Sequence, residues 1–207
     1  MFKKYIPETT VRVIKRIKNI ILKYGFYLAG GTSLSLHLGH RYSKDLDFFN
    51  SQEFDSETLS SEILKLGGKI IYSERDTVHS EIDKTLVSMF YYPYPLLYPL
   101  EYFEGIPVAS LKDVAAMKLL SLSQRAEKKD YFDIVFIMKN ISIRELKDLM
   151  IKKFSKERLN WYHITKSLFF FEDVESSPDP ICEEISWDEV KRFLLSKRRE
   201  IESIFLE

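Results

Sequence analysis

Residues 28–49, LAGGTSLSLHLGHRYSKDLDFF, restrict the fold of this chain more than any other segment. Gly30 and Gly31 stand side by side in a chain that has only seven glycines. The apolar run before them predicts a short buried strand, and the leucines after them predict a helix that begins at the glycine pair. The DLDFF segment then predicts a second strand. This order of strand, turn, helix and strand indicates an α/β fold.

The rest of the chain divides into an α/β region and a helical region. Apolar spacing before residue 110 predicts further helices at 7–25 and 56–68, and further strands at 69–76, 79–83, 85–92 and 105–110. The prolines of YPYPLLYPL exclude a central strand there, because proline lacks a ladder donor. Later segments have helical spacing, and 186–205 predicts one continuous helix. We therefore expect an α/β core at 1–109 and a helical region at 110–207.

Composition excludes several classes of protein. Lysine plus arginine equals aspartate plus glutamate at 31 each, so the net charge gives no argument for a nucleic-acid partner. The single cysteine, Cys182, excludes an intrachain disulfide and favours a reducing compartment. The opening MFKKYIPETT lacks the apolar centre of a signal peptide, and no apolar run approaches the roughly 18 residues of a membrane span. We expect a soluble cytoplasmic protein with no membrane partner.

The aspartate pair of DLDFF is a candidate metal site. Successive side chains of a strand alternate between its faces, so Asp45 and Asp47 are expected to point the same way. Adjacent carboxylates repel each other unless a cation lies between them, and Mg²⁺ typically takes one or two carboxylates with substrate phosphates. The alternative is an exposed edge strand with two surface aspartates. The flanking Leu46, Phe48 and Phe49 favour a buried strand, and the pattern alone leaves both roles open.

The glycine pair is a candidate phosphate site. Gly30, Gly31 and Thr32 lie between a predicted strand and a predicted helix, where backbone N–H groups and the positive end of the helix dipole bind phosphate. Thr32 and Ser33 add hydroxyl donors. The segment is neither a Walker loop nor a G-x-G-x-x-G turn. Taken alone, the glycine pair favours an ordinary tight turn.

Spacing joins these two candidates. Fourteen residues separate Gly31 from Asp45, enough for one short helix and a return to the adjacent strand. Together the two motifs resemble the hG[GS]…DxD signature of the polymerase β-like nucleotidyltransferase superfamily. The segment is most similar to the AbiEii/AbiGii toxin family, in which GGT-x-L-x-L-x-x-GHR-x-S-x-DLDFF is typical. The resemblance implies an α/β (α+β) nucleotidyltransferase core with a mixed sheet flanked by helices, and a C-terminal helical region packed on that core.

A second block of the sequence resembles the same family. The segment ASLKDVAAMKLLSLSQRAEKKDYFDI, at 109–134, matches a block with a lysine on a helix followed by R-x-x-K-x-D-x-x-D. The resemblance implies that Lys118 contacts nucleotide phosphates, that Arg125 and either Lys128 or Lys129 add positive charge, and that Asp130 belongs to the site. The alternatives are a solvated helix lysine at Lys118 and a charge that complements the helix dipole at Asp130.

One position departs from the superfamily pattern. Nucleotidyltransferases usually have a third carboxylate on a later strand, facing the metal pair. The strand at 85–92 offers Ser88 at that place, and Glu81 and Asp83 lie just upstream. The third ligand is therefore expected to be Glu81 or Asp83, or to be absent. Without one, the chain would hold a single metal ion or would bind nucleotide without turning it over.

The resemblance also implies an activity. It indicates an enzyme with Mg²⁺ or Mn²⁺ as cofactor that transfers a nucleoside monophosphate from an NTP to RNA, in particular the 3′ end of tRNA. It would act as the toxin of a type IV toxin–antitoxin or abortive-infection system, with a cognate antitoxin as possible partner. Basic clusters on the first helix and at 152–158 could contact RNA, although a solvated face is the simpler interpretation. The alternatives are an inactive nucleotide-binding module and an enzyme that transfers AMP to protein.

Overall fold

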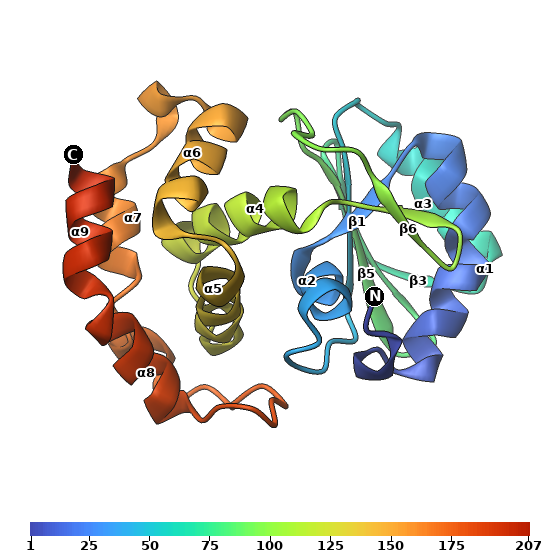
Figure 1. Cartoon of the computed structure of the whole chain (residues 1–207). Coiled ribbons are helices and arrows are strands. Elements are labelled where there is room, and N and C mark those ends of the chain that lie inside the picture. The colour runs from blue at the N-terminus through green and yellow to red at the C-terminus, as the bar shows by residue number, and fades with distance from the viewer. The chain divides into compact units, whose positions relative to one another are not determined.

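A seven-stranded mixed sheet organises the first half of the molecule. The computed structural model describes residues 1–207 and divides into two units, Met1–Ser110 and Leu111–Glu207 (Figure 1). The first unit contains every strand, and the second consists of helices and their connections. The α/β fold class expected from the sequence is therefore confirmed.

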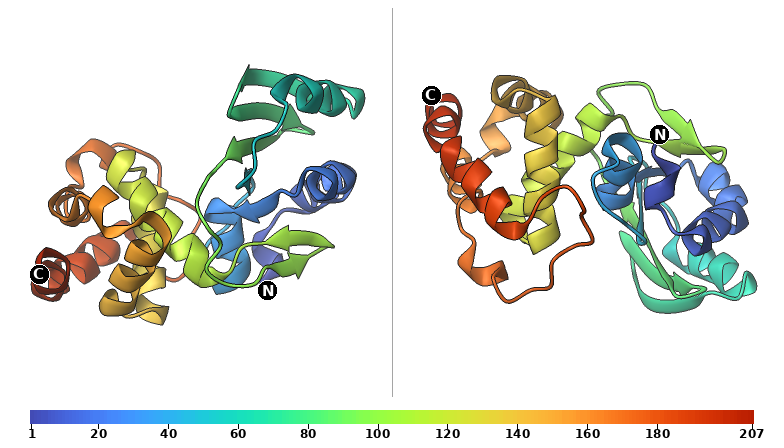
Figure 2. Two further views of the ribbon diagram at one scale, coloured as in Figure 1. Left: turned by 90° about the horizontal axis from the view of Figure 1, so that it is seen from above. Right: turned by 60° about the horizontal axis from the view of Figure 1, so that its bottom comes forward.

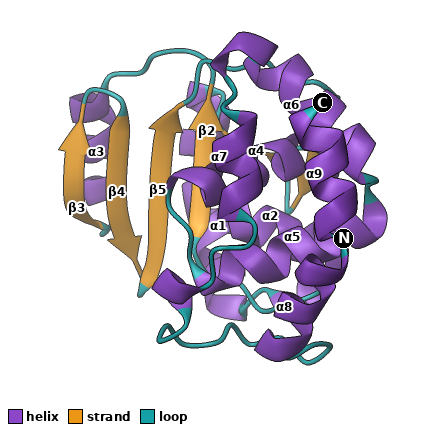
Figure 3. Ribbon diagram, turned by 90° about the vertical axis from the view of Figure 1, so that its left-hand side faces the viewer, coloured by secondary structure: helices purple, strands orange, loops and turns teal.

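The sheet places the DLDFF segment at its centre. Its strands are β1 (Tyr27–Ala29), β2 (Leu46–Asn50), β3 (Lys69–Glu74), β4 (Thr77–Ile82), β5 (Thr85–Tyr91), β6 (Glu101–Phe103) and β7 (Ile106–Val108). Their spatial order is β3-β4-β5-β2-β1-β7-β6, and Figure 3 shows β3, β4, β5 and β2 side by side. β2 runs parallel to β5 and antiparallel to β1. β6 was not expected, because it directly follows the proline-containing YPYPLLYPL segment, which was excluded as a strand.

The helices of the first unit are α1 (Glu8–Tyr24), α2 (Gly30–Leu38) and α3 (Ser56–Lys65). Of these, α1 and α3 cover one face of the sheet (Figure 2). α1 ends at Gly25, whose φ of 76° is the left-handed conformation that favours glycine after a helix. Ile17 of α1 and Ile63 of α3 join one buried cluster with Phe48 of β2. This packing leaves the opposite side chains of β2, including Asp47, outside the main core.

The second unit is built from helices alone. These are α4 (Leu111–Gln124), α5 (Lys128–Asn140), α6 (Ile143–Phe154), α7 (Trp161–Ser167), α8 (Trp187–Ser196) and α9 (Arg198–Leu206). The prediction of a single helix at 186–205 was wrong, since the helix is interrupted at Lys197. α8 packs on α5, whereas α9 packs on α6 and α7. The two parts of the expected helix therefore have different packing partners. No helix of the chain has both the length and the apolar character needed to cross a membrane.

Candidate active site

The glycine turn and the second aspartate lie against each other. Ala29 pairs with Asp47 across β1 and β2, and α2 begins at the next residue, Gly30. Gly30 has φ +66°, and a Cβ at this position would lie 2.5 Å from Oδ2 of Asp47. Only glycine combines this backbone conformation with room for the carboxylate. The structure thus brings the candidate phosphate site and one candidate metal ligand together.

The second glycine makes room for a cation that the sequence interpretation did not assign to the site. A Cβ at Gly31 would lie 2.5 Å from Nη2 of Arg41 and 3.5 Å from Oγ of Ser43. Arg41 is 4% exposed, and its Nη1 donates to the carbonyl of Tyr42 at 3.1 Å. A buried guanidinium beside the first turn of α2 adds positive charge where a phosphate would bind. The arginine of the GHR tripeptide was the available signal for this role.

The two hydroxyls expected to bind nucleotide point inward in this structure. Oγ1 of Thr32 lies 2.8 Å from Oγ of Ser43 and also donates to the carbonyl of Asp45. Thr32 thereby holds the segment that leads into β2. Oγ of Ser33 is buried and has no hydrogen-bond partner. Because the Thr32 hydroxyl is already engaged, the backbone N–H groups at the start of α2 are the main donors available to a phosphate at this turn.

Asp45 has the property expected of a metal ligand. It stands one residue before β2, which begins at Leu46 rather than at Asp45 as the DLDFF pattern had suggested. Its Oδ1 is buried and has no hydrogen-bond partner. A buried carboxylate oxygen without a partner is costly, and a divalent cation would satisfy it. Asp45 and Asp47 therefore fit Mg²⁺ or Mn²⁺, which accept one or two carboxylates together with phosphate oxygens and water.

No carboxylate is the direct strand neighbour of Asp47 at the place where the superfamily pattern has its third acid. Ser88 of β5 lies directly next to Asp47 in the parallel register, and Nδ1 of His79 lies 2.9 Å from Oγ of Ser88. Asp83 pairs with Arg16 of α1 at 3.1 Å, which directs it to the helix-covered face. Glu81 is exposed on β4, opposite Leu86. Because side chains alternate along a strand, Glu81 shares the face of His79 and Asp47, two strands away from β2, and it remains a candidate for the third ligand. No group of three or more His, Cys, Asp or Glu side chains in the chain is arranged to hold a metal ion.

Lys118 is buried in a cluster of charges within the second unit. Its Nζ lies 2.7 Å from Oδ1 of Asp130 and 3.0 Å from Oδ2 of Asp133, and its side chain is only 9% exposed. A solvated helix lysine is therefore excluded. Asp130 also accepts from the backbone N–H of Glu127 at 2.9 Å as part of a capping box, so its helix-terminal role is real as well. Asp133 is one helical turn from Asp130, which puts both carboxylates on one face of α5.

The other predicted cations of this unit lie at the surface between α4 and α5. Arg125 and Lys129 both pair with Glu127, at 3.1 and 2.9 Å. Burial raises the pKa of Glu127, but the neighbouring Lys129 and Arg125 outweigh it and hold that pKa below its ordinary value. Lys128 instead bonds Asp179 at 2.9 Å and is buried. The sequence left open whether Lys128 or Lys129 adds positive charge to the site. Lys129 is the one whose side chain is exposed to solvent and can be reached by a ligand.

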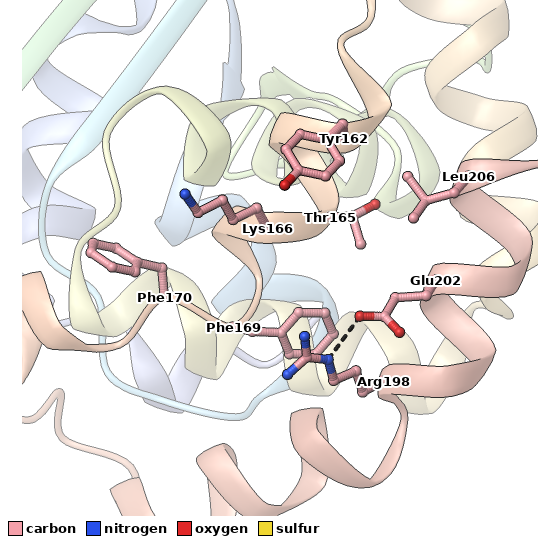
Figure 4. Close-up of a pocket in the computed structure, with 8 residues that line it drawn as sticks. All are labelled: Tyr162, Thr165, Lys166, Phe169, Phe170, Arg198, Glu202 and Leu206. Atoms are coloured by element: carbon pink, nitrogen blue, oxygen red, sulfur yellow. Dashed lines mark hydrogen bonds and ion pairs between the residues drawn. The ribbon is translucent and has the colours of Figure 1, made fainter.

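A cavity elsewhere in the second unit contains none of the predicted site residues. It has a volume of about 320 Å³ and lies between α7 and α9 (Figure 4). Arg198 pairs with Glu202 at 2.7 Å on its wall and lies over the ring of Phe169. These charges are already satisfied within the protein, so the cavity is not assigned to the candidate active site.

Comparison with known families identifies the protein class. The sequence profile described as "Nucleotidyl transferase AbiEii toxin, Type IV TA system" matches residues 12–101 and 92–203. The chain belongs to the AbiEii nucleotidyltransferase toxin family. An uncharacterized protein of Aquifex aeolicus (strain VF5) is 37% identical over 196 residues, which are 90% of this chain and 93% of that protein. The protein is thus an enzyme of the nucleotidyltransferase class, as the sequence predicted.

Solved structures share the fold of this AbiEii family member. A putative nucleotidyltransferase from H. pylori superimposes with a TM-score of 0.60 at 17% identity, covering 97% of this chain and 96% of that chain. MenT4, a nucleotidyltransferase toxin from Mycobacterium tuberculosis H37Rv, superimposes with a TM-score of 0.54 at 16% identity, covering 96% of this chain and 91% of that chain. At these identities the comparison shows a common architecture.

Substitution of Gly30 by alanine tests the close contact at the glycine turn. Gly30→Ala is expected to lower nucleotide transfer at least about tenfold, because the new methyl group displaces the carboxylate of Asp47, and a misplaced catalytic group is costly. Gly25→Ala is the matched control: its φ is also positive, at +76°, but a Cβ there meets nothing within 4 Å. Both variants should lose about 1 kcal/mol of stability from backbone strain. Equal losses of activity in the two variants would contradict this account.

Proposed function

We propose that this protein transfers a nucleoside monophosphate from an NTP to the 3′ hydroxyl of an RNA, with tRNA as the preferred acceptor, and that it needs Mg²⁺ or Mn²⁺. The observation that supports this most strongly is the unpartnered Oδ1 of Asp45 beside the contact between Asp47 and Gly30. A carboxylate pair next to a helix N-terminus combines a cation site with a phosphate site. Family membership supports nucleotide transfer as the reaction.

The proposed reaction breaks a phosphoanhydride bond of the NTP and forms a phosphodiester bond to the acceptor. The acceptor oxygen forms a bond to the α-phosphorus of the NTP, the bond from that phosphorus to the β-bridging oxygen breaks, and pyrophosphate leaves. Asp45 and Asp47 would hold the divalent cation, and the first N–H groups of α2 with Arg41 would bind the triphosphate. When bound, the cation stabilises the charge that develops on the phosphate oxygens. The proton of the acceptor hydroxyl passes to water.

The second unit contributes charged groups to this proposal. Lys118, held by Asp130 and Asp133, would contact nucleotide phosphates, and the exposed Arg125 and Lys129 would provide further positive charge. Both surface cations now pair with Glu127, so a polyanion would have to compete with one carboxylate. In the cell the protein would act in the cytoplasm as the toxin of a type IV toxin–antitoxin or abortive-infection system, with a cognate antitoxin as partner.

A direct transfer assay tests the proposed function. Purified protein with Mg²⁺, each α-labelled NTP and total tRNA is expected to label tRNA at its 3′ end, because the site combines cation, phosphate and acceptor chemistry. A chelator should abolish labelling, and added Mg²⁺ or Mn²⁺ should restore it. Absence of transfer to any RNA, with wild type equal to Asp45→Asn, would contradict the proposal.

A second candidate function rests on a specific observation. Ser88, bonded to His79, stands where a third carboxylate is usual, which favours a catalytically weak or inactive nucleotide-binding module. NTP binding without release of pyrophosphate would support that candidate, and turnover would exclude it. Label on protein rather than on RNA would instead identify an enzyme that transfers AMP to protein.

A further inference from the structure

The sheet face that carries Asp47 is lined with aromatic rings. Leu46 and Phe48 of β2 point into the core below α1 and α3, so Asp47 and Phe49 point to the opposite face. On β4 and β5 the same alternation puts His79, Ser88 and Phe90 on the face of Asp47. The buried partners are Val78, Ser80, Val87 and Met89. We call the face of Asp47 and Phe49 the open face.

Ring contacts cross five neighbouring strands on this face. Tyr27 of β1 stacks on Phe49 of β2 with centroids 6.2 Å apart, and Phe49 stacks on Phe90 of β5 at 5.2 Å. Phe90 meets His79 of β4 edge to face at 5.4 Å, and His79 meets Tyr72 of β3 at 5.9 Å. These five residues are called the aromatic row. With neighbouring strands about 4.8 Å apart, the row is about 19 Å long, and its part from Phe49 to Tyr72 is about 14 Å long.

Strand register places the aromatic row next to the aspartate pair. Asp47, Ser88 and His79 are direct neighbours across β2, β5 and β4. Phe49 and Phe90 form the next pair on the same face, two residues further along both strands. Two residues of a strand span about 7 Å, so Phe49 lies about 7 Å along β2 from Asp47, a distance that neighbouring nucleotides of a single strand can bridge.

Contacts within the fold account for only part of this row, such as Phe49, on which Tyr92 packs edge to face at 5.2 Å. A sheet face that meets water normally carries polar side chains, and a face that meets a core buries its rings. Phe49 and Phe90 are only partly buried, and Tyr72 is 45% exposed. Tyr27, at the β1 end of the row, is 3% exposed and therefore buried. The other four rings are fixed by mutual contacts yet reach solvent, and they form a surface that suits flat, aromatic ligands.

We propose that the aromatic row stacks the unpaired terminal bases of a single-stranded nucleic-acid acceptor and thereby places its 3′ hydroxyl at Asp45 and Asp47. This inference rests on the proposed function and assigns the acceptor position within the same site. Sheet-borne aromatic side chains stack successive bases of single strands, and such stacking tolerates any base sequence. The length of the row exceeds that of one base, which favours an oligonucleotide over a mononucleotide as its occupant.

The variants that test the row remove rings without disturbing the core. Tyr72→Ala and Phe90→Leu are each expected to weaken binding of a single-stranded oligonucleotide about tenfold, the size expected from loss of one stacked base. Phe90→Tyr keeps a ring and should bind as wild type does. Tyr102→Ala is the matched control, because Tyr102 is 67% exposed on β6 of the same unit and outside the row.

Binding and transfer are measured separately, so that this inference and the proposed function can fail independently. Binding of a fluorescent single-stranded RNA is measured without NTP, and KM for acceptor and for NTP are measured in the transfer assay. We expect the row variants to raise the Kd and KM for acceptor and to leave the KM for NTP unchanged. Row-dependent binding in a protein that transfers no nucleotide would support the inference while the proposed function fails.

Two outcomes would overturn the inference. In the first, transfer to RNA occurs, but Tyr72→Ala and Phe90→Leu bind acceptor as tightly as Tyr102→Ala does. In the second, the row variants raise the KM for a protein acceptor and leave RNA binding unchanged, which would assign the row to protein. Thermal unfolding of each variant excludes loss of fold as the cause of weaker binding.

Discussion

Replacement of Asp47 by asparagine should reduce nucleotide transfer by about three powers of ten. Asparagine keeps the shape of the side chain against Gly30 but removes the negative charge that holds a divalent cation. Stabilisation of a transferring phosphate by a metal ion contributes several kcal/mol, and each 1.36 kcal/mol corresponds to a factor of ten in rate. The measurement is the initial rate of label transfer at saturating NTP and Mg²⁺. Asp45→Asn should have an effect of similar size.

The control for this prediction is another aspartate of the same unit. Asp76 is exposed at the turn between β3 and β4, and Asp76→Asn should leave the transfer rate within about twofold of wild type, as surface substitutions away from a site usually do. The melting temperatures of all three variants should stay close to that of wild type. A rate for Asp47→Asn within tenfold of wild type would show that Asp47 is not a metal ligand.

The largest loss of stability is expected at an ion pair in the helical unit. Nζ of Lys153 on α6 lies 2.8 Å from Oδ1 of Asp113 on α4, and both side chains are 0% exposed. Lys153→Met should lower the free energy of unfolding by about 3–5 kcal/mol, because the carboxylate of Asp113 would lose its counter-ion in a buried place. Both tryptophans, Trp161 and Trp187, belong to this unit, so their fluorescence during urea denaturation reports its unfolding.

An exposed ion pair between the same two helices provides the control. Lys112 of α4 lies 2.7 Å from Glu145 of α6, with side chains 44% and 40% exposed. Lys112→Met should cost no more than about 1 kcal/mol, since water screens this pair. The double variant Lys153→Met/Asp113→Leu should regain most of the lost stability, because it leaves no buried charge unpaired. Equal costs for Lys153→Met and Lys112→Met would contradict the role of burial.

Local sequence was a good guide where the interacting residues are close in the chain. Gly30 and Asp47 belong to adjacent elements, and strand–helix–strand connectivity brings them together across β1 and β2. Apolar spacing and glycine positions likewise predicted α1 with its glycine cap, and α2 with its start at the glycine pair. These patterns failed for the last two helices, because Lys197 marks a change of packing partner and not a change in apolar spacing.

Distant partners decided how the predicted side chains are used. Thr32 could have faced a ligand, but its hydroxyl holds Ser43 and Asp45 instead. For Lys118 the sequence left a solvated helix position open as an alternative, yet Asp130 and Asp133 of the next helix enclose it. Sequence patterns describe which residue types occur, whereas hydrogen-bond partners depend on which elements meet in the folded chain.

Residue types and short-range connectivity were enough to predict the family, the glycine turn and the aspartate pair, because these features depend on neighbours in the chain. The folded chain was needed to show that Ser88 and His79 lie beside Asp47, and that rings from five strands form the aromatic row. The physical reason is that the order and register of strands in a sheet come from long-range pairing and burial, which local propensity does not specify.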